Sequence, residues 1–224
     1  TGWVLIIDEV QYLSSKELAS LIAAIHKMNQ RALPILFFAG GLPQIARLTG
    51  EAKSYSERLF LFPPIGALEP ADARDAIELP LKALEAKIDD DALVEIIKQT
   101  QGYPFFLQEW GHHAWNIAPT AHIKLAHVQE ATTRAHARLD EGFFRMRMDR
   151  LTPKESDYVK AMGLMGKGPH AASDVAKALG RTPQAVGTLR EAVIKKGMIY
   201  TPRYGLLDFT VPNFHEFLAR TEQP

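Results

Sequence analysis

Residues 1–9 constrain the fold of this chain more than any other segment. Residues 4–7 are a short apolar run rich in β-branched side chains, and Asp8 and Glu9 follow it at once. A run of this kind predicts a buried strand of a parallel sheet. Open α/β sheets bind ligands at the carboxyl ends of their strands, so the two acids stand at a candidate ligand site. The alternative is a buried strand that simply ends in a charged loop.

Two carboxylates at this position suit nucleotide hydrolysis, in which one belongs to the Mg²⁺ shell and the other polarises the attacking water. Such a site also needs the phosphate-binding pattern G-x-x-x-x-G-K-[ST], and no segment of the sequence matches it. Gly40 and Gly41 are followed by Leu42 and Pro43 instead. The chain also opens directly on the strand. We therefore expect the C-terminal part of a longer protein, and a fragment that does not itself hydrolyse ATP at a useful rate.

Three segments follow one another, at residues 1–66, 67–150 and 151–224. The first alternates strands and helices, with strands predicted at 4–7, 34–38 and 59–62 and with Ser14 and Glu17 as a capping box between the first two. This alternation implies parallel pairing with right-handed crossovers. The second segment reads as wholly helical, and its aromatic side chains favour core packing over a binding groove. The fold class is therefore multidomain α/β plus α.

The third segment has the clearest pattern of element starts and stops. Thr152, Pro153 and Glu155 predict the start of a helix. A second helix is expected over 172–179 and a third over 182–196, and two short strands at 198–200 and 206–209 surround a turn. Helix, helix, turn, helix and a β-wing is the order of a winged helix-turn-helix.

These segments together resemble the AAA+ ATPases, in the branch of the archaeal origin initiators and the STAND signalling ATPases. Residues 4–9 resemble the Walker B motif, and 34–40 resemble the sensor-1 strand. Residues 56–58 stand where such enzymes carry an arginine finger, and 102–104 resemble the G-x-P motif of the lid. The resemblance implies a partial P-loop ATPase core at 1–66, a helical lid segment at 67–150 and a winged-helix C-terminal module at 151–224.

The resemblance also implies roles for single residues. Asp8 would orient Mg²⁺ through water, and Glu9 would be the general base or water-positioning group. Arg58 would stabilise charge on the γ-phosphate of a neighbouring subunit, with a surface charge as the alternative. Nucleotide contacts would come from the remaining motif positions, Gly40, Gly102 and Pro104. For Pro104 the alternative is a plain helix start, because proline is favoured at the first helical position. ATP and Mg²⁺ are thus the expected cofactors of the longer protein, with none bound tightly to this fragment.

Two departures from the family pattern weaken the expected hydrolysis. The sensor-1 strand ends in Ala39 and two glycines rather than a polar side chain, and Phe105 and Phe106 occupy the place of the usual lid arginine. The phosphate-loop strand of the family also lies between the second and third strands seen here. We therefore expect those two strands to pair with each other, or another chain to supply an edge, which makes a homo-oligomer through the ATPase core or the sheet edge a further expectation.

Double-stranded DNA is the expected partner of the C-terminal module. A recognition helix places its N-terminal residues at base edges, and flanking cations contact phosphates. Residues 151–224 carry 10 basic and 7 acidic side chains. The candidate DNA contacts are Arg181, Thr182, Gln184, Thr188, Arg190, Lys195, Lys196, Arg203 and Tyr204. Because winged helices also bind proteins, a STAND-like regulatory ATPase with a protein-binding module is the alternative.

Composition sets only broad limits. The whole chain has 26 basic and 26 acidic side chains, so no global charge argues for nucleic acid. The absence of cysteine excludes disulfides and suits a reducing cytoplasm. The longest apolar stretches are too short to cross a membrane. We therefore expect a cytoplasmic protein without a membrane partner.

Overall fold

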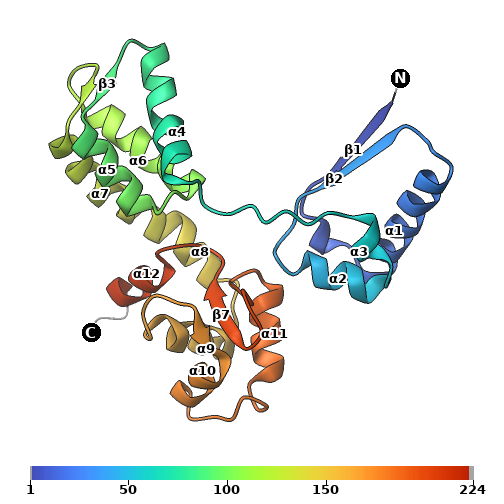
Figure 1. The fold of residues 1–224 in the computed structure, drawn as a ribbon. Helices are drawn as coiled ribbons and strands as arrows, with labels where there is room; N and C mark the ends of the chain where they lie inside the picture. Colours follow the sequence, from blue (N-terminus) through green and yellow to red (C-terminus); the bar gives the residue numbers. More distant parts are fainter. Residues whose placement is uncertain (1, 222–224) are drawn as a thin grey trace. The chain divides into compact units, whose positions relative to one another are not determined.

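The computed structural model describes residues 2–221. These residues belong to two compact units that divide between Ile65 and Gly66 (Figure 1). Within residues 2–221, no helix combines the length and the apolar character that a membrane span requires.

The first unit is built on a parallel pair of strands. β1 (Trp3–Ile7) pairs with β2 (Ile35–Ala39) along the full length of both strands. α1 (Ser15–Gln30) forms the crossover between them. The Ser14 hydroxyl accepts the Glu17 backbone N–H at 3.3 Å, and the Glu17 carboxylate accepts the Ser14 N–H at 2.8 Å. The predicted capping box is therefore confirmed.

The sheet of the first unit is only partly covered. Val10, Leu18 and Ile22 form a small buried core. The remaining elements of the unit are η1 (Val10–Tyr12), α2 (Ile45–Ala52) and α3 (Ser56–Leu59). Several large apolar side chains of the two strands are nevertheless more than half exposed, namely Trp3, Val4, Ile6, Leu36 and Phe38.

The third strand predicted for this unit is wrong. Leu59 ends α3, and residues 60–66 have no regular secondary structure. Phe60, in this apolar run, packs its side chain on β2 instead, since the centroid of its ring lies 5.8 Å from that of Phe37. A strand needs a neighbouring strand for its backbone hydrogen bonds, and the described sheet holds only β1 and β2. The predicted pairing of the second and third strands is therefore also wrong, whereas an edge supplied by another chain stays a prediction.

The second unit begins with four helices of the lid segment. The expectation of a wholly helical segment is wrong, because two short strands between these helices pair in parallel. Phe106 and Trp110 are fully buried, whereas Phe105 and Trp115 are about 40% exposed, so the predicted aromatic cluster packs only in part. The elements are α4 (Pro70–Ala83), β3 (Lys87–Ile88), α5 (Asp90–Thr100), α6 (Pro104–Ile117), β4 (His122–Ile123) and α7 (Leu125–Leu139). A π-helix, η2 (Asp140–Phe144), and α8 (Arg145–Met148) continue α7 without a break.

The C-terminal module combines helices with a three-stranded antiparallel sheet in the order β5-β7-β6. Its elements are α9 (Pro153–Gly163), β5 (His170–Ala171), α10 (Ala172–Ala178), α11 (Gly187–Lys195), β6 (Ile199–Tyr200), β7 (Leu206–Phe209) and α12 (Phe214–Thr221). The predicted start of the third helix at 182 is wrong. The Thr182 hydroxyl accepts the Ala185 N–H at 3.3 Å and closes a turn, so regular helix begins only at Gly187.

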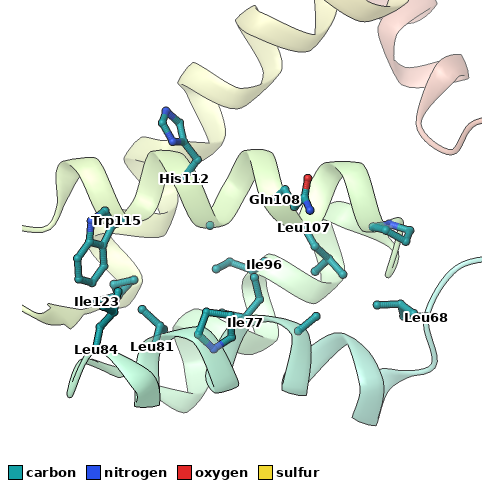
Figure 2. Close-up of a pocket in the computed structure, with 14 residues that line it drawn as sticks. Leu68, Ile77, Leu81, Leu84, Ile96, Leu107, Gln108, His112, Trp115 and Ile123 are labelled. Atoms are coloured by element: carbon teal, nitrogen blue, oxygen red, sulfur yellow. The ribbon is translucent and has the colours of Figure 1, made fainter.

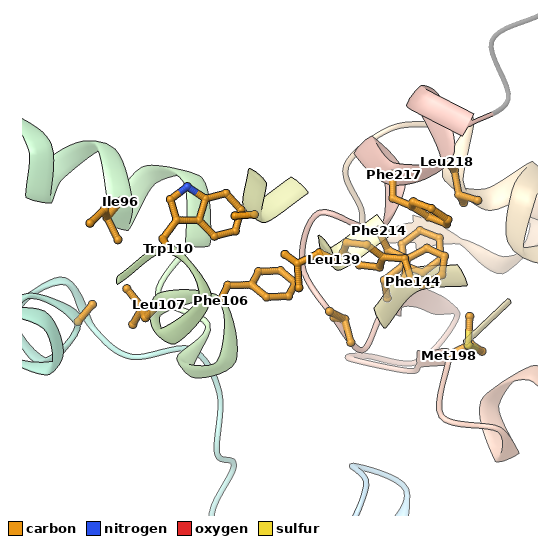
Figure 3. Packing of buried hydrophobic residues seen from close by; sticks show 14 of the residues in the cluster. Ile96, Phe106, Leu107, Trp110, Leu139, Phe144, Met198, Phe214, Phe217 and Leu218 are labelled. Carbon is orange, nitrogen blue, oxygen red and sulfur yellow. The ribbon is translucent and has the colours of Figure 1, made fainter. Parts of the chain in front are cut away.

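One hydrophobic core runs through the lid segment and the C-terminal module. The Phe144 ring, at the end of the π-helix, lies 5.3 Å from that of Phe214 and 5.0 Å from that of Phe217, both on α12. Figure 3 shows these three rings together. Aromatic pairs at such distances add to the stabilisation from burial. The two segments therefore share side-chain packing within one compact unit.

Candidate functional site

Asp8 and Glu9 lie at the carboxyl end of the two-stranded sheet, beside the end of β2. The Gly40 N–H donates to the Ile7 carbonyl at 2.9 Å, and the Val10 N–H donates to the Gly40 carbonyl at 3.0 Å. The Asp8 carboxylate accepts the Glu9 N–H at 2.9 Å. A Cβ atom at Gly40 would lie 2.7 Å from the Asp8 Oδ1 atom, so a larger residue there would displace this carboxylate from its present position. The structure thus brings Asp8, Glu9 and Gly40 together.

Gln11 connects the acids to the loop after β2, a role that the sequence interpretation missed. Its side-chain carbonyl accepts the Leu42 N–H at 3.1 Å, and its amide group donates to the Glu9 carboxylate. Glu9 itself has a left-handed backbone with φ 53°, which is uncommon for a residue other than glycine. In the sequence, the contacts of Gln11 have a single signal, namely that this polar residue stands directly after the apolar Val10.

Among residues 2–221, no group of three or more His, Cys, Asp or Glu side chains is placed to hold a metal ion, so Asp8 and Glu9 stand at this edge as a pair of acids. Both acids are exposed, and carboxylate oxygens are the ligands that Mg²⁺ prefers. Arg58 is also exposed, on α3. Among the described residues it forms no ion pair or hydrogen bond with Asp8 or Glu9. The structure therefore groups Asp8 with Gly40 and shows no bond between Arg58 and either acid among the described residues.

The glycine turn (residues 101–104) precedes α6 and has a strained backbone. Gln101 and Gly102 have φ values of 50° and 71°. The Leu68 N–H donates to the Gly102 carbonyl at 2.9 Å, and a Cβ atom at Gly102 would lie 2.4 Å from the Leu68 carbonyl oxygen. Close approach of two backbone segments thus requires glycine here. Pro104 takes the first position of α6, where proline is favoured.

An apolar pocket of about 400 Å³ lies between α4 and α6, close to the glycine turn (Figure 2). Its walls are aliphatic and aromatic, with Gln108 and His112 as polar groups. Pro104 is among the lining residues, and Figure 2 shows Leu68 and Trp115 toward opposite ends of the pocket. Pockets of this volume and character suit a largely apolar ligand surface. Sequence periodicity could not reveal it, because the pocket depends on the spacing between two helices.

The candidate DNA contacts are spread over the turn before α11, the helix itself and the β6–β7 turn. Arg181, Thr182 and Gln184 precede the helix, whereas Thr188, Arg190 and Lys195 lie on it. Arg203 and Tyr204 lie between β6 and β7 and are exposed. All of these but Arg190 are exposed, and Arg190 is half-buried.

Lys196 is engaged inside the module. Its ammonium donates to the Glu155 carboxylate at 2.6 Å and to the Arg150 carbonyl at 2.7 Å. The hydrogen bond from Lys196 to the Glu155 carboxylate lowers the pKa of Glu155, and so does the bond from the Thr152 N–H. Burial raises the pKa of the nearby Tyr158 hydroxyl to about 12, so that tyrosine stays neutral. Lys196 is therefore part of the module's own packing, which leaves its ammonium poorly placed for a DNA phosphate.

One sequence family and one curated protein resemble this chain. A family model described as a domain of unknown function (DUF8462) matches residues 141–218. The chain is also similar to the uncharacterized HTH-type transcriptional regulator MJ0774 of Methanocaldococcus jannaschii, with 23% identity over 212 residues. That match covers 90% of this chain and 51% of the relative. The chain thus spans about half the length of the curated relative it matches.

Two solved structures show what kind of fold this is. The Walker-type ATPase PABY2304 of Pyrococcus abyssi matches with a TM-score of 0.68 and 15% identity, over 97% of this chain and 63% of that one. The RuvB Holliday junction branch migration motor of Thermotoga maritima matches with a TM-score of 0.53 and 16% identity, over 99% of this chain and 70% of that one. The chain therefore has an AAA+ ATPase-like fold.

Proposed function

We propose that this chain is part of an AAA+ ATPase in which Asp8 and Glu9 serve ATP hydrolysis. The observation that carries the proposal is the position of both acids at the carboxyl end of β1, against Gly40, in a chain with an AAA+ ATPase-like fold. Asp8 would hold Mg²⁺ through water, and this ion would supply charge stabilisation on the phosphates. Glu9 would orient the attacking water and take its proton.

The remaining nucleotide roles belong to the same proposal. Residues 4–9 would be the Walker B motif, and Gly40 would leave space at the phosphate side of the sheet edge. Gly102 and Pro104 would contact the nucleotide from the lid segment. Arg58 is exposed, as a residue that acts on a neighbouring subunit must be. The open edges of β1 and β2 support association through this unit, which sedimentation of the protein at several concentrations would measure.

Replacing Glu9 tests the hydrolytic role. In the protein that contains this chain, Glu9→Gln should lower the rate of ATP hydrolysis by about 10²-fold or more, since general-base catalysis contributes roughly 10²–10⁴-fold. Binding of ATP should be retained, because the amide keeps the size of the carboxylate. Glu51→Gln is the matched control, since Glu51 is an exposed acid of the same unit that pairs with Arg47. Equal hydrolysis by wild type and Glu9→Gln would contradict the proposal.

We further propose that the C-terminal module is a winged helix that binds duplex DNA. Three helices followed by the β6–β7 hairpin support this interpretation. Thr188 and Arg190 on α11, with Arg181, Thr182 and Gln184 before it, would face base edges. Lys195, Arg203 and Tyr204 would contact phosphates. Lys196 is removed from this set, because Glu155 holds its ammonium.

The DNA-binding role has its own test. Arg203→Ala should weaken duplex affinity for every sequence and lower the slope of log affinity against log salt by about one. Arg190→Ala should weaken affinity in a way that depends on the sequence. Lys98→Ala in the lid segment is the control, since it removes the same charge from an exposed site outside the module. If Arg203→Ala changed neither the duplex affinity nor its salt dependence, the proposed DNA-binding surface would be wrong.

A protein-interaction role for the module is the second candidate function. The engagement of Lys196 favours it, because a cation expected at DNA is neutralised internally. The whole protein would then be a regulatory ATPase of the STAND type, whose nucleotide state changes the arrangement of its segments. Absence of duplex binding at low salt, with ATP binding intact, would favour this candidate over the first.

A further inference from the structure

Asn213, in the C-terminal module, holds the glycine turn of the lid segment. Its amide group donates to the Gln99 carbonyl at 2.8 Å, and its side-chain oxygen accepts from the Gln101 side chain. Asn213 is 8% exposed, and its backbone is left-handed with φ 61°. A buried amide that uses both its donor and its acceptor on one short segment fixes the position of that segment.

The same turn is held from another segment by Leu68. The backbone N–H of Leu68 donates to the Gly102 carbonyl at 2.9 Å. Leu68 lies just after Ile65 and Gly66, where the chain passes from the first compact unit to the second. The glycine turn therefore joins three parts of the chain: the segment that leaves the first unit, the lid helices and the C-terminal module.

Contacts at both ends of α12, which directly follows Asn213, hold this helix against the π-helix of the lid segment. The Arg220 guanidinium makes two hydrogen bonds to the Asp140 carboxylate, at 3.0 and 2.7 Å. At the other end of α12, Phe214 packs against Phe144. Bidentate arginine–carboxylate pairs fix orientation as well as distance. A displacement of the C-terminal module thus has to move Asn213, and with it the glycine turn.

We propose that Asn213 is a positioning residue for the glycine turn, through which nucleotide binding and occupancy of the C-terminal module are linked. The inference rests on the proposed function of this turn as a nucleotide contact. Because Asn213 acts through Gln101 and the Gln99 carbonyl, a ligand on the module changes the turn, and a nucleotide at the turn changes the module. Such coupling is reciprocal: each ligand alters the affinity for the other by the same factor.

Amide hydrogen exchange tests the positioning without any ligand. Asn213→Gly removes both side-chain hydrogen bonds and keeps the left-handed backbone, which glycine adopts readily. The Leu68 and Tyr103 amides, bonded to the Gly102 and Thr100 carbonyls, should exchange about tenfold faster in this variant, as expected for the loss of hydrogen bonds to a buried group.

Arg220→Gln is the matched control, because it loosens the same interface away from the turn. It should leave the exchange of both amides unchanged. Unchanged exchange in Asn213→Gly would overturn the proposal. Equal acceleration in Arg220→Gln would also overturn it, since the effect would then be a general loosening of the interface.

The linkage itself is tested in the protein that contains this chain. The ratio of the duplex DNA dissociation constants with and without ATP should differ from one in the wild type and move toward one in Asn213→Gly. An unchanged ratio in the variant would overturn the linkage. Failure of the proposed function has a different signature, namely no ATP or DNA binding by the wild type, and the exchange comparison still decides whether Asn213 positions the turn.

Discussion

Replacing Lys196 with alanine tests how the C-terminal module is held together. The lysine ammonium has two short hydrogen bonds, to the Glu155 carboxylate and the Arg150 carbonyl. Glu155 is buried, so the substitution leaves a buried carboxylate with one partner fewer. Hydrogen bonds to charged groups contribute about 1.5–3 kcal/mol each. The Lys196 side chain is 34% exposed, so solvent offsets part of the loss, and we expect unfolding free energy to fall by about 2 kcal/mol.

The loss should depend on pH in one direction. The hydrogen bond from Lys196, followed by that from the Thr152 N–H, holds the pKa of Glu155 below its ordinary value of 4.5. A carboxyl group with a lowered pKa in the folded state contributes stability above its unfolded pKa and loses that contribution as the pH falls through the folded value. The difference between wild type and Lys196→Ala should therefore be full at neutral pH and shrink as the pH falls below the ordinary glutamate pKa of 4.5.

Urea unfolding, monitored by circular dichroism, measures the difference in unfolding free energy between wild type and Lys196→Ala at neutral pH and at acidic pH. Lys195→Ala is the matched control, since Lys195 is the exposed neighbour at the end of α11, and such surface substitutions change stability by about 0.5 kcal/mol or less. Equal stability of the Lys195 and Lys196 variants at neutral pH would refute the reasoning. So would a difference that grows as the solution is acidified.

Three further substitutions probe separate parts of the structure. Gly163→Ala should lower the unfolding free energy by about 1–3 kcal/mol in urea melts, because a Cβ atom there would lie 2.2 Å from the Leu218 Cδ1 atom; an unchanged melt would contradict this packing of α9 on α12. Gly40→Ala should displace the Asp8 side chain and reduce ATP hydrolysis by the whole protein at least about tenfold, while circular dichroism stays the same; full activity would count against the site. Phe144→Ala should lower the unfolding free energy by about 3–5 kcal/mol in the same urea melts. A decrease of less than about 1 kcal/mol would show that the shared core of the second unit is not continuous.

Local sequence signals predicted several element starts, although not the start of α11. Ser14 with Glu17 and Thr152 with Glu155 form the capping boxes expected of them. Pro104 takes the first position of α6, a position that proline favours. Such signals succeed because capping and proline preferences depend on residues within a few positions of one another.

Features that depend on distant residues could not be predicted in this way. The apolar run at 59–62 has the composition of a strand, but its fate depends on whether a neighbouring strand exists. The contact between Gln101 and Asn213 joins residues 112 positions apart, and nothing in either local pattern announces it. Lys196 looked like a surface cation, because its partner Glu155 lies in a different helix.

The site shows the same division between local and distant signals. Asp8 and Glu9 are candidates because acids follow an apolar run directly, and their role stays a prediction. Gly40 came to their side because parallel strands end at the same edge. Gln11 was missed, since its role depends on reaching both Glu9 and Leu42 across the loop. The pocket between α4 and α6 was missed because helix spacing is a tertiary property.

Titration of fluorescent duplex DNA with this chain, at two salt concentrations, tests the central claim most directly. An ATPase-like chain with a DNA-binding module should bind in the micromolar range, and the affinity should fall steeply as the salt concentration rises, because phosphate contacts release counterions. No binding at the lower salt concentration would contradict the DNA-binding role and assign the C-terminal module to contacts with another protein.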